Sequence, residues 1–352
     1  MRGTVADIRT TESLRTLVKI DPATALVGWQ LPGALVLTED GGRYGSKLRW
    51  VAGAPEYRIG EEVIVFVAQR ADGTLHTADL GMGKYEIEAG RALRRLGGGA
   101  NVLRAGRLLP PRDDAVDVKR FADSIRARRG QLHAANRAFR VPNDARAEPA
   151  EAFTYLGTPA RWFDPVAAYA IDRNGLSGFT SASSHYAAQQ AAAAWSSGAS
   201  LTLVIGDAID PAPFAGCDGS SSITFDDPAD ELDDLANCAG TLAVSGFCSS
   251  SETTVIGPQV YRRIAIGKVL VNDGVGECLR GDPCKLAELL THELGHTIGL
   301  GHSADASATM SAVAHFDRRC ALLRQDDLAT EAIAYPAPGA RTAMVTATAT
   351  PN

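Results

Sequence analysis

The stretch Thr291–Ser303, THELGHTIGLGHS, holds three of the seven histidines of this 352-residue chain. It ends a longer segment, GDPCKLAELLTHELGHTIG, that carries helix signals at both ends. Asp282 suits the N-cap, Pro283 suits the first helical position, and Gly299 follows the last turn. Leucines and Ile298 recur every four residues, which predicts a buried stripe. A helix buried on one face is therefore the strongest constraint that the sequence sets on the fold.

The spacing of the histidines predicts a metal site. His292 and His296 are four residues apart, about 6 Å along the helix axis, on a face nearly opposite the leucines. Gly299 can adopt the left-handed conformation that turns the chain sharply, so that His302 returns as a third ligand. Three imidazoles with a fourth position left for water are typical of catalytic zinc. The alternative, surface histidines on an amphipathic helix, is disfavoured by the five fixed positions.

The carboxylate next to the first histidine predicts a hydrolytic role for this site. Glu293 is expected to project beside the open position of the metal. It would accept a proton from zinc-bound water, whose pKa the metal lowers to about 7, and pass it to the leaving amine. A catalytically silent zinc-containing adhesion or recognition protein needs the histidines but no base. That alternative stays open, as does a zinc hydrolase acting on a substrate other than a peptide.

The pattern resembles the metzincin zinc metallopeptidases, and among them the matrixins. HELGHTIGLGHS fits the metzincin signature, Ser303 is the matrixin choice after the third histidine, and Met310 in ASATM matches the Met-turn, an apolar floor beneath the zinc ligands. LRQDDLATEAIAYP resembles the closing helix, GKVLVND the strand before the active-site helix, and GTLAVSG the edge strand that pairs with substrate. The resemblance covers residues 155–336. It implies one catalytic zinc and a protein or peptide substrate lying antiparallel to the edge strand.

Several departures from the matrixin pattern limit what the resemblance implies. Ser311 and Ala312 follow Met310 where matrixins usually carry Tyr and Pro, so the shape of the main specificity pocket does not carry over. Only His185 lies upstream in the domain, so we expect no second, structural zinc. The first cysteine of the chain is Cys217, so the given sequence offers no pro-segment cysteine to silence the zinc.

Other polar groups near the motif are weaker candidates. His315 follows the Met-turn, and we expect it to be an exposed loop histidine. Asp326 and Asp327 open the last predicted helix, where acidic residues favour the positive end of the dipole. The loop Phe225–Asp234, FDDPADELDD, could offer oxygen ligands to calcium, although its spacing matches no defined calcium loop.

All six cysteines lie in the second half of the chain and form no C-x-x-C pair. An even number without that motif favours three disulfides in an oxidising compartment over a thiolate metal site. Spacing alone does not fix the pairing, although Cys278 with Cys284 is a local clasp that we expect before the zinc helix. The six candidates are Cys217, Cys238, Cys248, Cys278, Cys284 and Cys320.

The disulfides predict a secreted or extracellular protein. The segment MRGTVADIRT lacks the apolar run of a signal peptide, which implies that a leader has been removed. No stretch approaches the roughly 18 consecutive apolar residues of a membrane-spanning helix. We expect no membrane span and a monomeric chain.

Charge and pattern divide the chain into two domains. Residues 1–140 hold 23 Lys and Arg against 16 Asp and Glu, whereas residues 141–352 hold 12 against 25. The basic stretch RARRG is typical of a solvated helix surface, so we expect no nucleic-acid partner. Runs such as RTLVKI and EEVIVFVAQ, punctuated by EDGG and RADG, predict a small all-β domain, open or barrel-like.

The predicted domain order follows from these patterns. Residues 1–130 form the β-rich domain with a terminal helix, 131–154 a linker, 155–336 an α+β peptidase domain with a mixed sheet, and 337–352 a disordered tail. Through GAPEYRIGEEVIVFV and LGMGKYEI the first domain resembles the β-rich domain ahead of some secreted bacterial matrixins. Packing, inhibition and binding are all open as its role.

Overall fold

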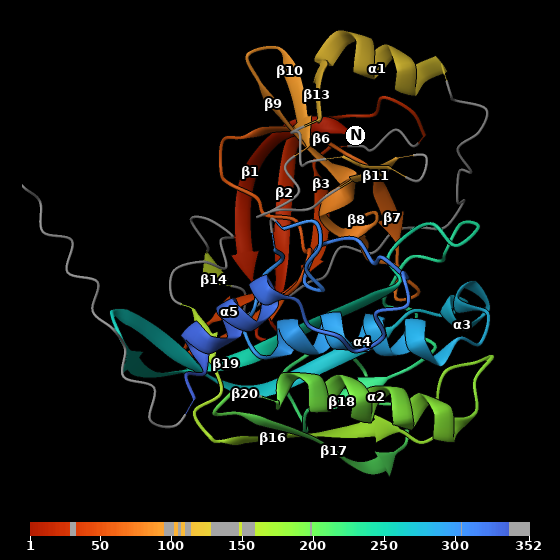
Figure 1. Cartoon of the computed structure of the whole chain (residues 1–352). Helices are drawn as coiled ribbons and strands as arrows, with labels where there is room; N and C mark the ends of the chain where they lie inside the picture. The colour runs from red at the N-terminus through yellow and green to blue at the C-terminus, as the bar shows by residue number, and fades with distance from the viewer. Residues whose placement is uncertain are drawn as a thin grey trace, which may run out of the picture.

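The computed structural model describes residues 1–28, 33–94, 102–104, 107–109, 114–127, 148–149, 159–197, 199–303 and 305–337. A β-rich N-terminal part, red to orange in Figure 1, lies beside a C-terminal part of strands and helices, green to blue. The predicted linker lies outside the described residues except at 148–149, and the predicted tail lies outside them except at 337.

The N-terminal part is built on an antiparallel sheet in the strand order β13-β10-β9-β6-β1-β2-β3, with β14 beside β1. Alternate residues of β1 and β2, among them Ile8 and Val18, are buried in its core, as their alternating pattern requires. The helix α1 packs on β6 and β9 through Ile125. The elements are β1 Arg2–Thr10, β2 Arg15–Thr24, β3 Leu35–Asp40, β6 Glu62–Val65, β7 Val67–Gln69, β8 Leu75–Thr77, the 3-10 helix η1 Leu80–Gly83, β9 Lys84–Glu88, β10 Arg91–Arg94, β11 Val102–Arg104, β12 Arg107–Leu109, β13 Asp114–Asp117, α1 Val118–Ala127 and β14 Glu148–Pro149.

The C-terminal part is built on a mixed sheet in the order β17-β16-β18-β20-β19-β5-β4, with β15 beside β20. Strands β17, β16, β18 and β20 pair in parallel, whereas β19 pairs with both of its neighbours in the antiparallel sense. The predicted α+β class with a preceding all-β region is thus confirmed. The elements are β15 Ala160–Arg161, β16 Val166–Asp172, α2 Ser181–Trp195, β17 Thr202–Ile209, β18 Ser222–Thr224, β19 Ala243–Ile256, β20 Gln259–Val271, α3 Val275–Leu279, α4 Pro283–Thr297 and α5 Gln325–Ala334.

Two strands of the mixed sheet come from the N-terminal part of the chain. The hairpin of β4, Gly42–Tyr44, and β5, Lys47–Val51, adds to the sheet at β19. Val51 lies opposite Gly246 and Leu48 lies opposite Ser249. The two parts of the molecule therefore share one sheet, a connection that no local sequence pattern predicted.

Helices α2 and α4 pack side by side (Figure 1). Small alanines of α2 allow the close approach, and the indole of Trp195 donates to the carbonyl of Thr291 at 2.7 Å. Asp282 caps α4 and Pro283 begins it, as predicted. In α2 the N-cap is Thr180, whose hydroxyl accepts from the amide of Ser183.

Three disulfides close loops of the C-terminal part: Cys217–Cys248, Cys238–Cys278 and Cys284–Cys320. The expected pairing of Cys278 with Cys284 is wrong. The reason is local, because Arg280 and Gly281 both adopt positive φ between α3 and α4. The chain turns sharply there, and the two cysteines form disulfides with two separate loops.

Candidate active site

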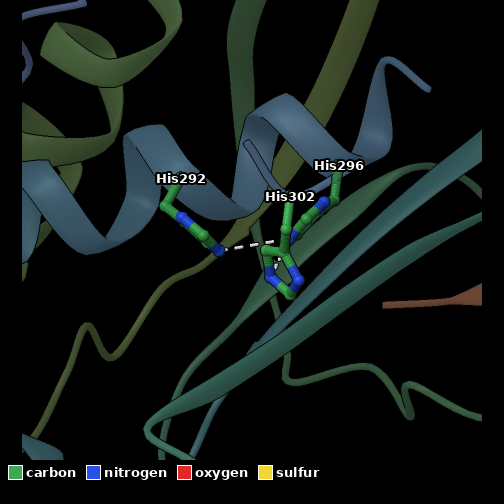
Figure 2. Close-up of side chains that lie close together, drawn as sticks. All are labelled: His292, His296 and His302. Atoms are coloured by element: carbon green, nitrogen blue, oxygen red, sulfur yellow. Dashed lines mark hydrogen bonds between the residues drawn. The ribbon is translucent and has the colours of Figure 1, made fainter. Parts of the chain in front are cut away.

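The three motif histidines converge on one point (Figure 2). His292 and His296 project from α4, and His302 follows the turn after it. The Nε2 atom of His296 lies 3.1 Å from the Nε2 atoms of both His292 and His302. Three nitrogens bound to one tetrahedral zinc stand about 3.3 Å apart, so this spacing fits a single ion. In the part of the chain that the structure describes, no other three His, Cys, Asp or Glu side chains gather in this way.

The hydrogen bonds of the imidazoles leave their inner nitrogens ready for a metal. Nδ1 of His292 lies 2.8 Å from the carbonyl oxygen of Thr309, and Nδ1 of His296 lies 2.8 Å from that of Leu300. A ring nitrogen facing a carbonyl carries the proton, so each Nε2 keeps its lone pair. Burial, aided by the neighbouring histidines, lowers the pKa of His296 and brings the pKa of His302 to about 3. Neutral imidazoles with lone pairs facing one another suit a cation between them.

Gly299 makes the turn that brings the third histidine back. Its φ is +93°, and a Cβ at this position would lie 2.1 Å from the carbonyl oxygen of Ala160. Only glycine meets both conditions without strain. Leu300 follows directly, and its carbonyl orients His296. His302 comes two residues later.

Glu293 lies beside the histidines with its carboxylate buried. Its side chain is 5% exposed, and Oε2 accepts a hydrogen bond of 2.5 Å from the hydroxyl of Ser245 on β19. Burial raises the pKa of Glu293, although the neighbouring His292 and the hydrogen bond from Ser245 oppose the rise. A buried carboxylate next to a metal position is placed where a proton acceptor could act. Sequence reasoning missed Ser245, because its partner lies far along the chain.

Comparison with known protein families shows which family this domain belongs to. The family model for matrixins matches residues 161–335, which include the three histidines, Glu293 and strand β19. Residues 161–335 belong to the matrixin family. Because matrixins are zinc-dependent peptidases, this domain is a zinc metallopeptidase domain with a protein substrate. A search of curated proteins found no match to the chain.

The segment around Met310 is held by a carboxylate of α5. The amides of Thr309 and Met310 donate to Asp327 at 2.8 and 2.9 Å, and the amide of Arg324 donates to it at 2.8 Å. The carbonyl of Thr309 in turn orients His292. Asp327 therefore supports the histidine site, which goes beyond the expected interaction with the helix dipole.

Ser303 ties the third histidine to the same loop. Its amide donates to the carbonyl of Met310 at 2.8 Å, and its hydroxyl donates to Asp326. Met310 itself is 2% exposed, as an apolar floor requires. Both acidic residues at the start of α5 thus hold the segment around Met310.

His315 differs from expectation. Its side chain is 8% exposed, Nε2 lies 2.6 Å from the carbonyl oxygen of Ala306, and its amide donates to Glu288 at 2.7 Å. The expectation of an exposed loop histidine is wrong because the buried carboxylate of Glu288 on α4 draws this loop against the helix. His315 is not part of the histidine cluster.

The acidic loop after β18 uses its carboxylates within the protein. Asp226 accepts from the amide and the hydroxyl of Ser177, both at 2.8 Å. Asp227 accepts from the amides of Glu231 and Leu232 at 3.0 and 2.7 Å. These contacts account for Asp226 and Asp227 without calcium, and the calcium site stays a prediction.

Proposed function

We propose that this chain is a monomeric, secreted endopeptidase. Its matrixin domain would hold one zinc through His292, His296 and His302 and would hydrolyse peptide bonds with Glu293 as the base. The observation that carries the proposal is the convergence of three imidazoles, two of them with Nδ1 facing a carbonyl, beside one buried carboxylate.

Each residue has a defined task in this mechanism. A bound zinc would polarise the scissile carbonyl and acidify a water molecule. Glu293 would take up the proton of the attacking water and deliver it to the leaving amine. The hydroxyl of Ser245 fixes Oε2, which orients the carboxylate without contacting the substrate. Strand β19 is the edge to which an extended peptide would add once β5 no longer pairs with it.

The proposed location outside the cell rests on the cysteines. Three disulfides are stable in an oxidising compartment and rare in the cytosol. In the described ranges, no helix combines the length and the apolar character that a bilayer crossing needs.

The test is a digest of a peptide library, with mass-spectrometric mapping of the cut sites. Glu293→Ala should keep its zinc, yet cleavage should fall by about 10²–10⁴-fold, as for a lost general base. Glu277→Ala, the same change at an exposed position of α3, should cleave like the parent. His302→Ala should lose zinc and cleavage together, because two histidines hold zinc poorly.

The outcomes separate the alternatives. A Glu293→Ala variant that cleaves as fast as the parent would show that Glu293 is not the base. If neither the parent nor any variant cleaves while the parent holds about one zinc per chain, the silent zinc-binding protein is the better explanation. About two zinc ions per chain would contradict the prediction of a single site.

A further inference from the structure

We propose that the β4–β5 hairpin occupies the place of the substrate along β19 and keeps the peptidase latent. The inference rests on the proposed function, because it takes β19 as the edge to which a peptide substrate adds. It gives the N-terminal part a role as an inhibitor within the same chain.

The hairpin covers the one edge that a substrate strand needs. Strand β19 pairs with β20 on one side and with β5 on the other. Beyond the end of β5, the amide of Ala52 still donates to the carbonyl of Ser245 at 2.9 Å. That pairing therefore reaches the residue whose hydroxyl holds Glu293. One edge accepts one strand, so a peptide cannot add to β19 while β5 is bound.

The direction of β5 is that of the proposed substrate. It runs antiparallel to β19, from Leu48 opposite Ser249 to Val51 opposite Gly246. An extended peptide that adds to β19 with main-chain hydrogen bonds would run the same way. The hairpin is thus a substrate-like strand rather than an unrelated covering loop.

Trp50 brings the blocking strand up to the histidines. Its ring lies 5.7 Å from the ring of His296, centroid to centroid, and stacks on Phe247 at 5.3 Å. Its carbonyl oxygen is turned toward β19, where a Cβ on Gly246 would lie 2.0 Å from it. The group presented to His296 is therefore an indole, which offers no bond to hydrolyse. This geometry explains how a substrate-like strand can stay intact beside the site.

Buried contacts anchor the strand to both parts of the molecule. The guanidinium of Arg49 is 3% exposed and donates to the carbonyl of Phe214 at 3.0 Å and to Asp40 at 3.2 Å. Val51 packs with Phe214 and Val244 of the matrixin domain. Displacing β5 would break these contacts, so the hairpin does not dissociate from β19 without disrupting them.

A second contact outside the hairpin supports the same closed arrangement. His76 on β8 lies 3.2 Å from Asp233 in the acidic loop, and the amide of Asp79 donates to Asp233 at 2.8 Å. This loop belongs to the matrixin domain. The N-terminal part therefore contacts the matrixin domain at two separate places, β19 and the acidic loop.

The test uses the full-length, zinc-loaded chain with two variants that weaken the strand. Val51→Asp buries a charge among apolar side chains, and Trp50→Ala removes the ring beside His296. The control is Lys47→Ala, an exposed residue of the same strand. The readouts are kcat/KM on a quenched fluorescent peptide library and the Kd of a peptide hydroxamate, a zinc-directed inhibitor. In a latent enzyme only a small fraction of molecules has β5 displaced from β19, and both variants should enlarge that fraction. We therefore expect kcat/KM and hydroxamate affinity to rise roughly tenfold or more in both.

The two readouts separate this inference from the proposed function. Equal cleavage and equal hydroxamate affinity in parent, variants and control would overturn latency and leave the peptidase intact. If nothing cleaves, the proposed function fails, and the hydroxamate still decides: tighter binding to the variants supports occlusion, and equal binding overturns it. If kcat/KM and hydroxamate affinity rise as much in Lys47→Ala as in the two variants, the proposed role of Trp50 and Val51 is also overturned.

Hydrogen exchange of the unchanged protein provides a test that needs no variant. Saturating hydroxamate should speed amide exchange in a peptide covering Lys47–Val51, because the ligand can bind only when the strand leaves. Unchanged exchange with hydroxamate bound would show that the hairpin and a substrate-like ligand occupy the cleft together, which contradicts the proposal.

Discussion

At the scale of single residues, Ser245 connects the sheet to the catalytic helix. A hydrogen bond to a buried carboxylate is stronger than one between neutral groups, and this one spans 2.5 Å from Ser245 to Glu293. Both side chains are buried, so neither has water as an alternative partner. The bond fixes the position of the carboxylate beside the three histidines.

Removing this hydroxyl should lower stability. Ser245→Ala leaves a buried carboxylate oxygen without its donor, which should reduce the free energy of unfolding by about 1–3 kcal/mol. The measurement is denaturant unfolding of the zinc-loaded chain. Ser249→Ala is the control: it lies buried on the same strand, and its hydroxyl has no partner within the described residues. Equal losses in the two variants would show that the bond to Glu293 contributes nothing.

The sequence was informative at residues whose role depends on near neighbours. The convergence of His292, His296 and His302 needs only a helix and the turn at Gly299, and both are local. The contact of Ser245 with Glu293 depends on how β19 lies against α4, and spacing holds no information about that. The same reason hid the burial of His315 against Glu288.

At the scale of elements, α5 supports the site and carries a buried acid. Its first turn holds the amides of Thr309 and Met310 through Asp327. One turn later Glu331 is 3% exposed, and its Oε1 has no hydrogen-bond partner within the described residues. Burial raises the pKa of Glu331 to about 7.

This raised pKa predicts a pH-dependent stability. The folded state favours protonated Glu331, so its contribution is complete below the ordinary glutamate pKa and is lost as pH rises through about 7. Glu331→Gln, which stays neutral, should be more stable than the parent above neutral pH by up to about 3 kcal/mol, with little difference near pH 4.5. Thermal unfolding of both proteins from pH 4.5 to 8.5 measures the difference. A constant difference across that range would mean that Glu331 does not titrate as described, and Glu277→Gln serves as the exposed control.

Element positions were predicted better than the contacts between elements. The caps of α4 are local signals, and the structure confirms Asp282 and Pro283. Disulfide pairing depends on which loops meet, so the local pair of Cys278 with Cys284 failed at the reversal between α3 and α4.

At the scale of the whole molecule, two cores are joined through one sheet. Lys47–Val51 has the pattern of an ordinary strand of the N-terminal part, and no periodicity identifies a partner so far along the chain. The fold class could be predicted because each core has its own pattern. The shared sheet could not, because strand pairing leaves no mark on either strand alone.

Separating the two parts should expose a sheet edge. A chain beginning at residue 155 lacks β5, so β19 would present unpaired main-chain groups that favour self-association. Sedimentation velocity over a range of concentrations should show dimers or larger species for this fragment, whereas the full chain should stay monomeric. A fragment that holds zinc and stays monomeric throughout would show that β19 is not a reactive edge.

Gly246 sets a constraint on how this protein can evolve. Its missing side chain accommodates the carbonyl of Trp50, and any Cβ there would collide with that oxygen. A mutation that adds a side chain to this part of the cleft would thus alter the fit of a peptide and of the inhibitory strand at once. Preference for substrate and strength of inhibition are then inherited as one trait. Lineages that acquire new substrates should carry matching changes in Lys47–Val51.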